Sequence, residues 1–247
     1  MGKDFETRHE ATVDATPDQV WQAIATGPGL DSWFMGRNEV EPREGGTATM
    51  AMGDMFTAES TVVAWDPPRR IKTESAAAED GSFMAMEYLV EGRGQGSTVV
   101  RLVHSGFLSG DNWEEEYDAL RKGNPLYLAS LKQYVEHFSG RTATPVNTFA
   151  APLASEAEAW RKITSAVGVG EMVTAGDPVR FTVDDTEYAG IVDTVRYPSF
   201  LGIRTDDALL RFVGRGGVMG VGHHLFDQPD DKTATETWQA WLGKALA

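Results

Sequence analysis

The chain has 247 residues, enough for one large domain or two small ones, and no apolar run approaches the roughly 18 residues that a membrane-spanning helix needs. The absence of cysteine excludes disulfides, thiolate metal sites and a cysteine nucleophile. Acidic residues number 37 against 22 basic ones, and the resulting net charge of −15 disfavours binding to nucleic acid or to anionic lipid.

The N-terminal sequence MGKDFETRHE is polar and lacks the apolar segment of a secretory signal, so we expect a cytoplasmic protein. A first strand is predicted over FETRHEATVDA, residues 5–15, because alternate side chains would share one face. A helix is predicted over PDQVWQAIA, residues 17–25, with Thr16 as N-cap and Pro17 at its first position. The strand's shared face would carry Phe5, Thr7, His9, Ala11 and Val13.

A short second helix is predicted over GLDSWFM, residues 29–35, and the pattern changes to strands and turns from Gly46 onwards. Two helices are then predicted, a short one over DNWEEEYDALRKG with Asp111 as its cap and a longer one over NPLYLASLKQYVEHF. One face of the longer helix would carry Leu128, Leu131, Val135 and Phe138. The intervening strands are predicted over TATMAM, FTAESTVVAW, IKTESA, SFMAMEYLVEG and STVVRLVHSGF.

A polar segment rich in structure-breaking residues, Ser139–Pro145, predicts a linker, and the pattern of the first half begins again after it. Five short stretches of the first half have echoes, in the same order, in the second half. The offset between matched residues falls in steps, which indicates a second copy shortened by deletions. The matched residues are Trp21 with Trp160, Gly46 with Gly176, Pro68 with Pro198, His104 with His223, and Leu131 with Leu242.

Alternation along the predicted strands places large apolar side chains on one sheet face. That face would carry Met50, Met52, Met84, Met86 and Tyr88 and would look toward the long helix, with Trp33 and Phe34 closing one end. Methionine is flexible and polarisable and suits a wall that accommodates ligands of varied shape. An ordinary filled core requires the same stripe, so the pattern is consistent with either a pocket wall or a filled core.

The order of four motifs carries a resemblance to a known family. The motifs are Trp-Phe at Trp33, Glu-Pro-x-x-Gly-Gly at Glu41, Asp-Pro-Pro-x-Arg at Asp66 and His-Ser-Gly-Phe at His104. In this order they resemble the activator-homologue family of the heat-shock protein 90 ATPase. That family belongs to the START-like, or birch-pollen-allergen-like (SRPBCC), superfamily. Its members usually open the last helix with Gly-Trp, where this chain has Gly123-Asn124-Pro125.

The resemblance implies an α+β fold of the helix-grip type, in which a bent antiparallel sheet wraps a long C-terminal helix. It predicts a START-like domain over residues 1–140 and a shortened, degenerate START-like repeat over residues 145–247. The implied function is the binding of a small hydrophobic molecule in the cavity of the first domain, with no cofactor and no metal. The expected ligand-binding residues are Trp33, Phe34, Met50, Met52, Met84, Met86, Tyr88, His104, Leu128 and Leu131.

Two rival functions stay open. An enzyme, such as a cyclase, aromatase or hydrolase, would need buried polar groups that converge in the cavity, for example His104 with Tyr88 or Glu59. A chaperone-modulating interaction module would instead show a filled core and an exposed apolar patch. Chaperone contact is the weaker expectation, because no extra domain of the eukaryotic members is found, and neither nucleic acid nor membrane insertion is expected.

Other candidate chemistry is weak. The chain has no Gly-x-Ser-x-Gly elbow, no zinc-binding His-Glu-x-x-His helix and no phosphate-binding loop. His223 and His224 would point to opposite faces of a strand and are poorly placed to share one metal ion. His104 could act as an acid or base, although a structural histidine is the more common case. The run Glu114-Glu115-Glu116 is interpreted as a solvated helix face.

Overall fold

A computed structural model describes residues 2–53, 55–94, 96–110, 113–226 and 231–247. The chain forms two compact units, Met1–Arg141 and Thr142–Ala247. The division falls within the segment Ser139–Pro145. Within the described residues no helix is long and apolar enough to cross a membrane.

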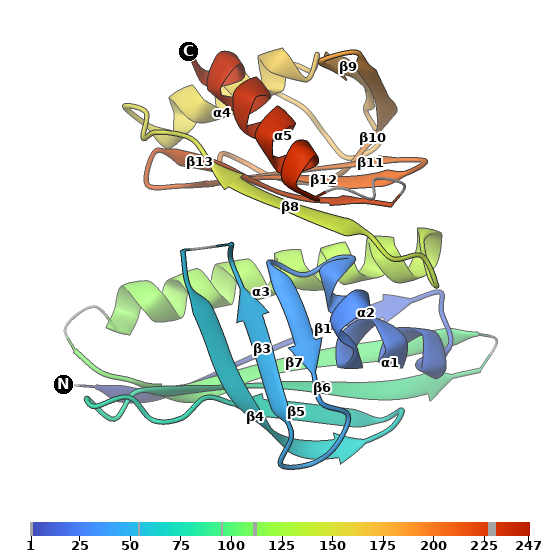
Figure 1. Ribbon diagram of the computed structural model, residues 1–247, viewed down its shortest axis with the longest axis vertical. Coiled ribbons are helices and arrows are strands. Elements are labelled where there is room, and N and C mark those ends of the chain that lie inside the picture. Colours follow the sequence, from blue (N-terminus) through green and yellow to red (C-terminus); the bar gives the residue numbers. More distant parts are fainter. Residues whose placement is uncertain (1, 54, 95, 111–112, 227–230) are drawn as a thin grey trace. The chain divides into compact units, whose positions relative to one another are not determined.

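The first unit contains one seven-stranded antiparallel sheet and three helices (Figure 1). The strand order is β1-β7-β6-β5-β4-β3-β2, so that the first strand pairs with the last and the remaining strands follow as a meander. Its elements are β1 (Lys3–Val13), α1 (Pro17–Ala25), α2 (Gly27–Asp31), β2 (Arg37–Val40), β3 (Thr47–Ala51), β4 (Thr57–Asp66), β5 (Arg70–Glu74), β6 (Phe83–Arg93), β7 (Ser97–Leu108) and α3 (Trp113–His137).

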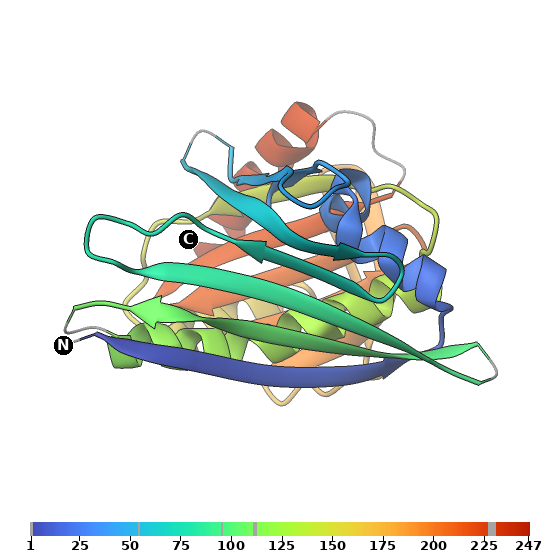
Figure 2. The ribbon, with the colours of Figure 1, turned by 90° about the horizontal axis from the view of Figure 1, so that it is seen from below.

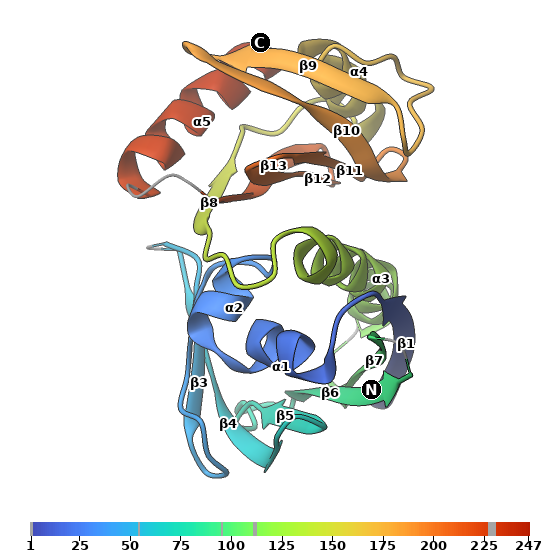
Figure 3. The ribbon, with the colours of Figure 1, turned by 90° about the vertical axis from the view of Figure 1, so that its right-hand side faces the viewer.

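The sheet of the first unit is strongly curved, and its concave face surrounds the three helices (Figure 3). Figure 2 looks onto the opposite, convex face, on which β1, β7, β6 and β5 lie side by side. We call the concave face the inner face and the convex face the outer face. This arrangement fixes which side chains can meet the long helix α3.

The start of α1 follows the sequence signal closely. The hydroxyl of Thr16 accepts a hydrogen bond from the backbone N–H of Gln19, and the Gln19 side chain accepts one from the backbone N–H of Thr16. This reciprocal capping box satisfies two donors that the first turn would otherwise leave unpaired. The face behind the cap buries Val20 and Ile24 against the sheet and so anchors the segment that follows.

The second helix is shorter than predicted and lies earlier in the chain. Pro28 sits in its first turn, and the helix ends at Asp31, so Trp33 follows it and is not helical. The reason is local: the Asp31 carboxylate accepts hydrogen bonds from the backbone and side chain of Asn38, which turns the chain into β2. Strand β2 itself was not predicted, because RNEV has no apolar alternation.

The two predicted helices that end the first unit form one helix of 25 residues, α3. Pro125 lies inside it, where proline removes one backbone hydrogen bond but does not prevent the helix when tertiary packing holds both halves. Leu128 and Leu131 are deeply buried on its sheet-facing side. Asp111, the predicted cap of the shorter helix, lies outside the described residues.

The second unit has one strand fewer and two helices. Its sheet order, β8-β13-β12-β11-β10-β9, again pairs the first strand with the last and continues as a meander. Helix α5 packs its two tryptophans, Trp238 and Trp241, into an aromatic core. The elements are β8 (Thr144–Phe149), α4 (Glu156–Ala166), β9 (Pro178–Val183), β10 (Thr186–Arg196), β11 (Phe200–Thr205), β12 (Ala208–Arg215), β13 (Val218–Leu225) and α5 (Asp231–Leu246).

The predicted fold class is confirmed. Both units are α+β, with an antiparallel sheet and a C-terminal helix in the helix-grip arrangement. Two turns, β4–β5 and β10–β11, each contain a cis peptide bond before proline, at Pro68 and Pro198.

Candidate functional site

The inner face of β6 and β7 brings several predicted site residues together. Met86 pairs with His104, and Tyr88 pairs with Leu102, so all four side chains share one face. His104 also pairs with Thr7 of β1. A hydrogen bond of 2.8 Å from the Asn124 side chain of α3 to the Thr7 hydroxyl shows that this is the face that α3 covers.

Trp33 and Phe34 lie beside this face at the end of α2. The indole N–H of Trp33 donates to the backbone oxygen of Ala23 at 2.9 Å, which fixes the ring and leaves the side chain 2% exposed. Its ring centroid is 6.3 Å from that of Tyr88, in an edge-to-face contact. Phe34 contacts Trp33 at 5.4 Å and Tyr127 of α3 at 4.9 Å. The pair therefore links the sheet to the helix.

The methionines of β3 are less uniform. Met50 pairs with Asn38 on β2 and shares the inner face with it, since the Asn38 side chain bonds to α2. The thioether of Met50 packs so closely on Gly36 that a Cβ at that glycine would lie 2.9 Å from its sulfur. Met52 lies just beyond the end of β3, in the turn that connects it to β4, and is buried there.

Burial divides the predicted residues into two groups. Leu128 and Leu131 of α3 are deep core, at 3% and 0% exposure. Met84 is 40% exposed, and Met50 and Met86 of the inner face are half-buried, as are Phe34 and Tyr127 beside it. A filled core would cover them fully, so this part of the inner face is incompletely covered by the protein itself. We call the set Phe34, Met50, Met84, Met86, Tyr88, His104 and Tyr127 the inner-face site.

The hydroxyl of Tyr88 stands out within the inner-face site. The side chain is only 4% exposed, and among the described residues its oxygen has no hydrogen-bond partner. Burial raises its pKa, with a further contribution from nearby Tyr127, so the group stays protonated and is a hydrogen-bond donor. Burial also raises the pKa of Tyr127 to about 12. A buried hydroxyl without a partner is costly and requires an explanation.

His104 is held by a short polar chain. The Asn124 side-chain nitrogen donates to Thr7, so its oxygen faces Nδ1 of His104 at 3.5 Å. With the amide in this orientation, Nδ1 carries the imidazole proton and Nε2 is left as an acceptor. Burial lowers the pKa of His104, the Asn124 contact opposing it, so the ring is neutral near pH 7.

Sequence reasoning did not select Thr7, Asn124 and Tyr127 as site residues. The sequence does carry a signal for Asn124: it lies four residues before Leu128 and seven before Leu131, so the apolar stripe of the helix extends to it. Treating Gly123-Asn124-Pro125 as a helix start hid this continuation. Tyr127 is adjacent to the stripe, and only contacts seen in the structure, with the ring of Phe34 and the thioether of Met35, mark it.

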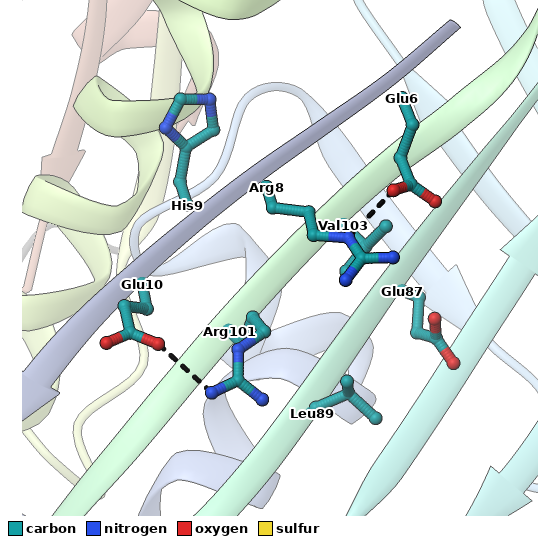
Figure 4. Close-up of a pocket in the computed structure, with 8 residues that line it drawn as sticks. All are labelled: Glu6, Arg8, His9, Glu10, Glu87, Leu89, Arg101 and Val103. Atoms are coloured by element: carbon teal, nitrogen blue, oxygen red, sulfur yellow. Dashed lines mark hydrogen bonds and ion pairs between the residues drawn. The ribbon is translucent and has the colours of Figure 1, made fainter.

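A groove of about 440 Å³ lies on the outer face, over β1, β7 and β6. Figure 4 shows Glu6, Arg8, Glu10 and Arg101 on that side, whereas His9 points to the other side of β1. Both arginines have acidic partners, Arg8 with Glu6 at 2.7 Å and Arg101 with Glu10 at 3.0 Å. The groove is therefore a charge-paired, solvated surface with no side chain set aside for a ligand.

Across the described parts of the chain, no cluster of three or more histidine, aspartate and glutamate side chains could hold an ion. His223 and His224 do lie on opposite faces of β13, since Leu209 pairs with His224 while His223 contacts Trp238. Among the described residues, the inner-face site thus combines apolar side chains with a donor at the Tyr88 hydroxyl and an acceptor at Nε2 of His104, and Nε2 of His9 is a further buried atom of the first unit without a partner.

Comparison with known proteins supports a family for the first unit. A family model described as Activator of Hsp90 ATPase homolog 1-like protein matches residues 14–136. Comparison with curated protein sequences gives no significant match.

Solved structures include proteins similar to the chain. The Aha1 dimer from Colwellia psychrerythraea is 20% identical, with 55% of this chain and 99% of that one covered and a TM-score of 0.46. A Mesorhizobium loti protein is 18% identical, with 52% and 95% covered and a TM-score of 0.46. DynU16, a protein of the dynemicin biosynthetic locus, is 17% identical, with 98% and 96% covered and a TM-score of 0.47.

Proposed function

We propose that the first unit, whose residues 14–136 match the AHSA1-like family model, binds a small hydrophobic molecule against the inner face of its sheet. The observation that carries the proposal is the buried Tyr88 hydroxyl without a partner, surrounded by apolar side chains that the protein covers incompletely. A ligand would cover Met84 and Met86 and would supply the missing hydrogen bond. Small-molecule sites commonly combine an apolar wall with a few placed polar groups.

Differences between the two units at corresponding positions support ligand binding by the first unit. We infer that it is a shortened copy of the first. In both units a strand bends around one valine: Val62 bonds to the backbone of Gly45 and Gly46, and Val192 bonds to that of Gly176 and Asp177. The register shifts directly after each valine. The shared sheet order and this shared bulge fit a duplication better than chance similarity.

The proposed duplication aligns Tyr88 with Phe212. Tyr88 pairs with Leu102, two residues before His104, and Phe212 pairs with Val221, two residues before His223. The second unit thus has no hydroxyl at this position. The His223 ring lies 4.1 Å from that of Trp238, which fills the space beside it. We infer that the second unit is structural and that the first binds the ligand.

A chaperone-modulating role has less support. The incompletely covered Met84 and Met86 belong to the inner face, toward α3, and the other exposed large apolar side chains described in the first unit are Met55 and Phe56 near the β3–β4 turn and Val63 of β4. The outer-face groove is lined mainly by paired charges. The family name refers to an activator of a chaperone ATPase.

Binding of tetralin, a neutral bicyclic hydrocarbon, tests the proposal by ligand-observed NMR titration of the full chain. We expect saturable binding to the natural protein. Met86→Trp should fill the inner-face site and abolish it. Met172→Trp is the matched control, because Met172 is 92% exposed in the second unit, and should leave binding intact. No binding to the natural protein, or equal binding to Met86→Trp, contradicts the proposal.

A further inference from the structure

The inner-face site also specifies the polarity of its ligand. We propose that the bound molecule is uncharged and carries an acceptor oxygen, such as a ketone, for the Tyr88 hydroxyl and a hydroxyl group for Nε2 of His104. This inference rests on the proposed function and adds the chemical class of the ligand.

Tyr88 supplies the hydrogen-bond donor for the ligand. Its hydroxyl hydrogen has no acceptor among the described residues, so a ligand oxygen is the partner that would remove the cost of its burial. Tyr127 does not serve, because the Tyr88 hydroxyl makes no hydrogen bond to it, and the Tyr127 hydroxyl donates to the thioether of Met35 at 3.8 Å, a weak acceptor. The edge-to-face contact with Trp33 holds the Tyr88 ring, so the donor is preorganised.

The acceptor side is His104. The chain from Thr7 through Asn124 assigns the imidazole proton to Nδ1, and Nε2 has no hydrogen bond to the described protein. His104 is offset from Tyr88 by one step along the neighbouring strand, on the same face. Such diagonal neighbours lie about 7–8 Å apart, a span that a two-ring molecule covers.

The lack of a cationic side chain in the inner-face site argues against an acidic ligand. The residues of the inner-face site include no lysine, arginine or carboxylate. Asp31, the buried carboxylate close to this region, already accepts two hydrogen bonds from Asn38 and pairs with Arg37 at 3.3 Å. A ligand carboxylate would be desolvated here without a cation, which is strongly unfavourable. Fatty acids are therefore poor candidates, whereas hydroxy-ketones and related neutral ring compounds fit.

Four probes with the same ring skeleton test the ligand acceptor, the ligand hydroxyl and the ligand charge separately. They are tetralin, α-tetralone with a carbonyl, tetrahydronaphthol with a phenolic hydroxyl, and the anion tetrahydronaphthoate. Affinities for the full chain come from ligand-observed NMR titration. One added hydrogen bond should make tetralone and tetrahydronaphthol bind about five- to ten-fold more tightly than tetralin. Tetrahydronaphthoate should bind more weakly than tetralin.

Substitutions test whether Tyr88 causes the preference for tetralone and whether His104 causes the preference for tetrahydronaphthol. Tyr88→Phe should bring the tetralone-to-tetralin ratio of affinities to about one, and His104→Phe should do the same for tetrahydronaphthol. Tyr197→Phe removes an exposed hydroxyl from the second unit and should keep both ratios. If His104→Phe does not fold, which circular dichroism would show, the Tyr88 ratio alone decides.

The outcomes separate the two proposals. If tetralin fails to bind the natural protein, the proposed function is overturned, and the inference on the ligand class is overturned with it. If tetralin binds but tetralone has no advantage, or if Tyr88→Phe keeps that advantage, only the inference on the ligand class is overturned. Tightest binding of tetrahydronaphthoate would also overturn it, because it would require a cation at the inner-face site.

Discussion

The substitution Tyr88→Phe should stabilise the ligand-free protein, although most substitutions of buried residues destabilise. The hydroxyl is removed from water and, among the described residues, has no partner, so its burial costs about 1–3 kcal/mol. Phenylalanine keeps the ring that contacts Trp33 and leaves only the small void of one oxygen. We therefore expect a net gain of about 1 kcal/mol in the free energy of unfolding.

Equilibrium urea unfolding and thermal melting of the full chain measure this gain, which corresponds to a melting shift of about 3 °C. Tyr134→Phe is the matched control, because the Tyr134 hydroxyl donates to the backbone oxygen of Arg141 at 2.9 Å. Its removal should destabilise the protein by about 1 kcal/mol. If Tyr88→Phe destabilises as much as Tyr134→Phe does, the Tyr88 hydroxyl is satisfied in solution and the reasoning is refuted.

Three further outcomes are expected. Leu131→Ala should lower the free energy of unfolding by about 2–5 kcal/mol, since Leu131 is fully buried; a loss below about 1 kcal/mol in urea unfolding would contradict this. Thr16→Ala should cost about 1 kcal/mol through loss of the capping box, and Thr16→Ser should recover most of it in the same assay. Burial lowers the pKa of His104 and His223 below 6.5, so the unfolded chain binds more protons than the folded one as the pH falls. The free energy of unfolding due to these residues should therefore be level above about pH 7 and fall as the pH drops below 6.5. A urea midpoint that rises on acidification would contradict this.

Much of the fold could be predicted because its signals are local. The Thr16 cap and the alternation along β6 and β7 each determine an element from a few adjacent residues. The errors occur where tertiary contacts decide. Strand β2 exists because Asn38 bonds to Asp31, and α3 continues through Pro125 because both of its halves pack on the sheet. Neither contact is visible in a linear pattern.

The candidate site was predictable only in part for the same reason. Alternation placed Met86, Tyr88 and His104 on one face, and the register confirms that placement. Their role in binding stays a prediction. Alternation says nothing about which polar atoms are satisfied, because that depends on partners from other elements. The donor character of Tyr88 and the acceptor at Nε2 of His104 follow only from the absence of one hydrogen bond and the presence of Asn124.

If the duplication holds, few side chains separate the proposed ligand site of the first unit from the aromatic core of the second. The matching of Leu131 with Leu242 aligns Tyr127 with Trp238. Tyr127 contacts Phe34 at the margin of the inner face, whereas Trp238 lies over His223 and contacts Tyr188 at 5.3 Å and Phe212 at 6.4 Å. A larger ring on the helix thus covers the histidine in the second unit, and a phenylalanine there replaces the hydroxyl. Because the sheet order is the same in both units, we attribute the difference in proposed function to these positions and not to the fold.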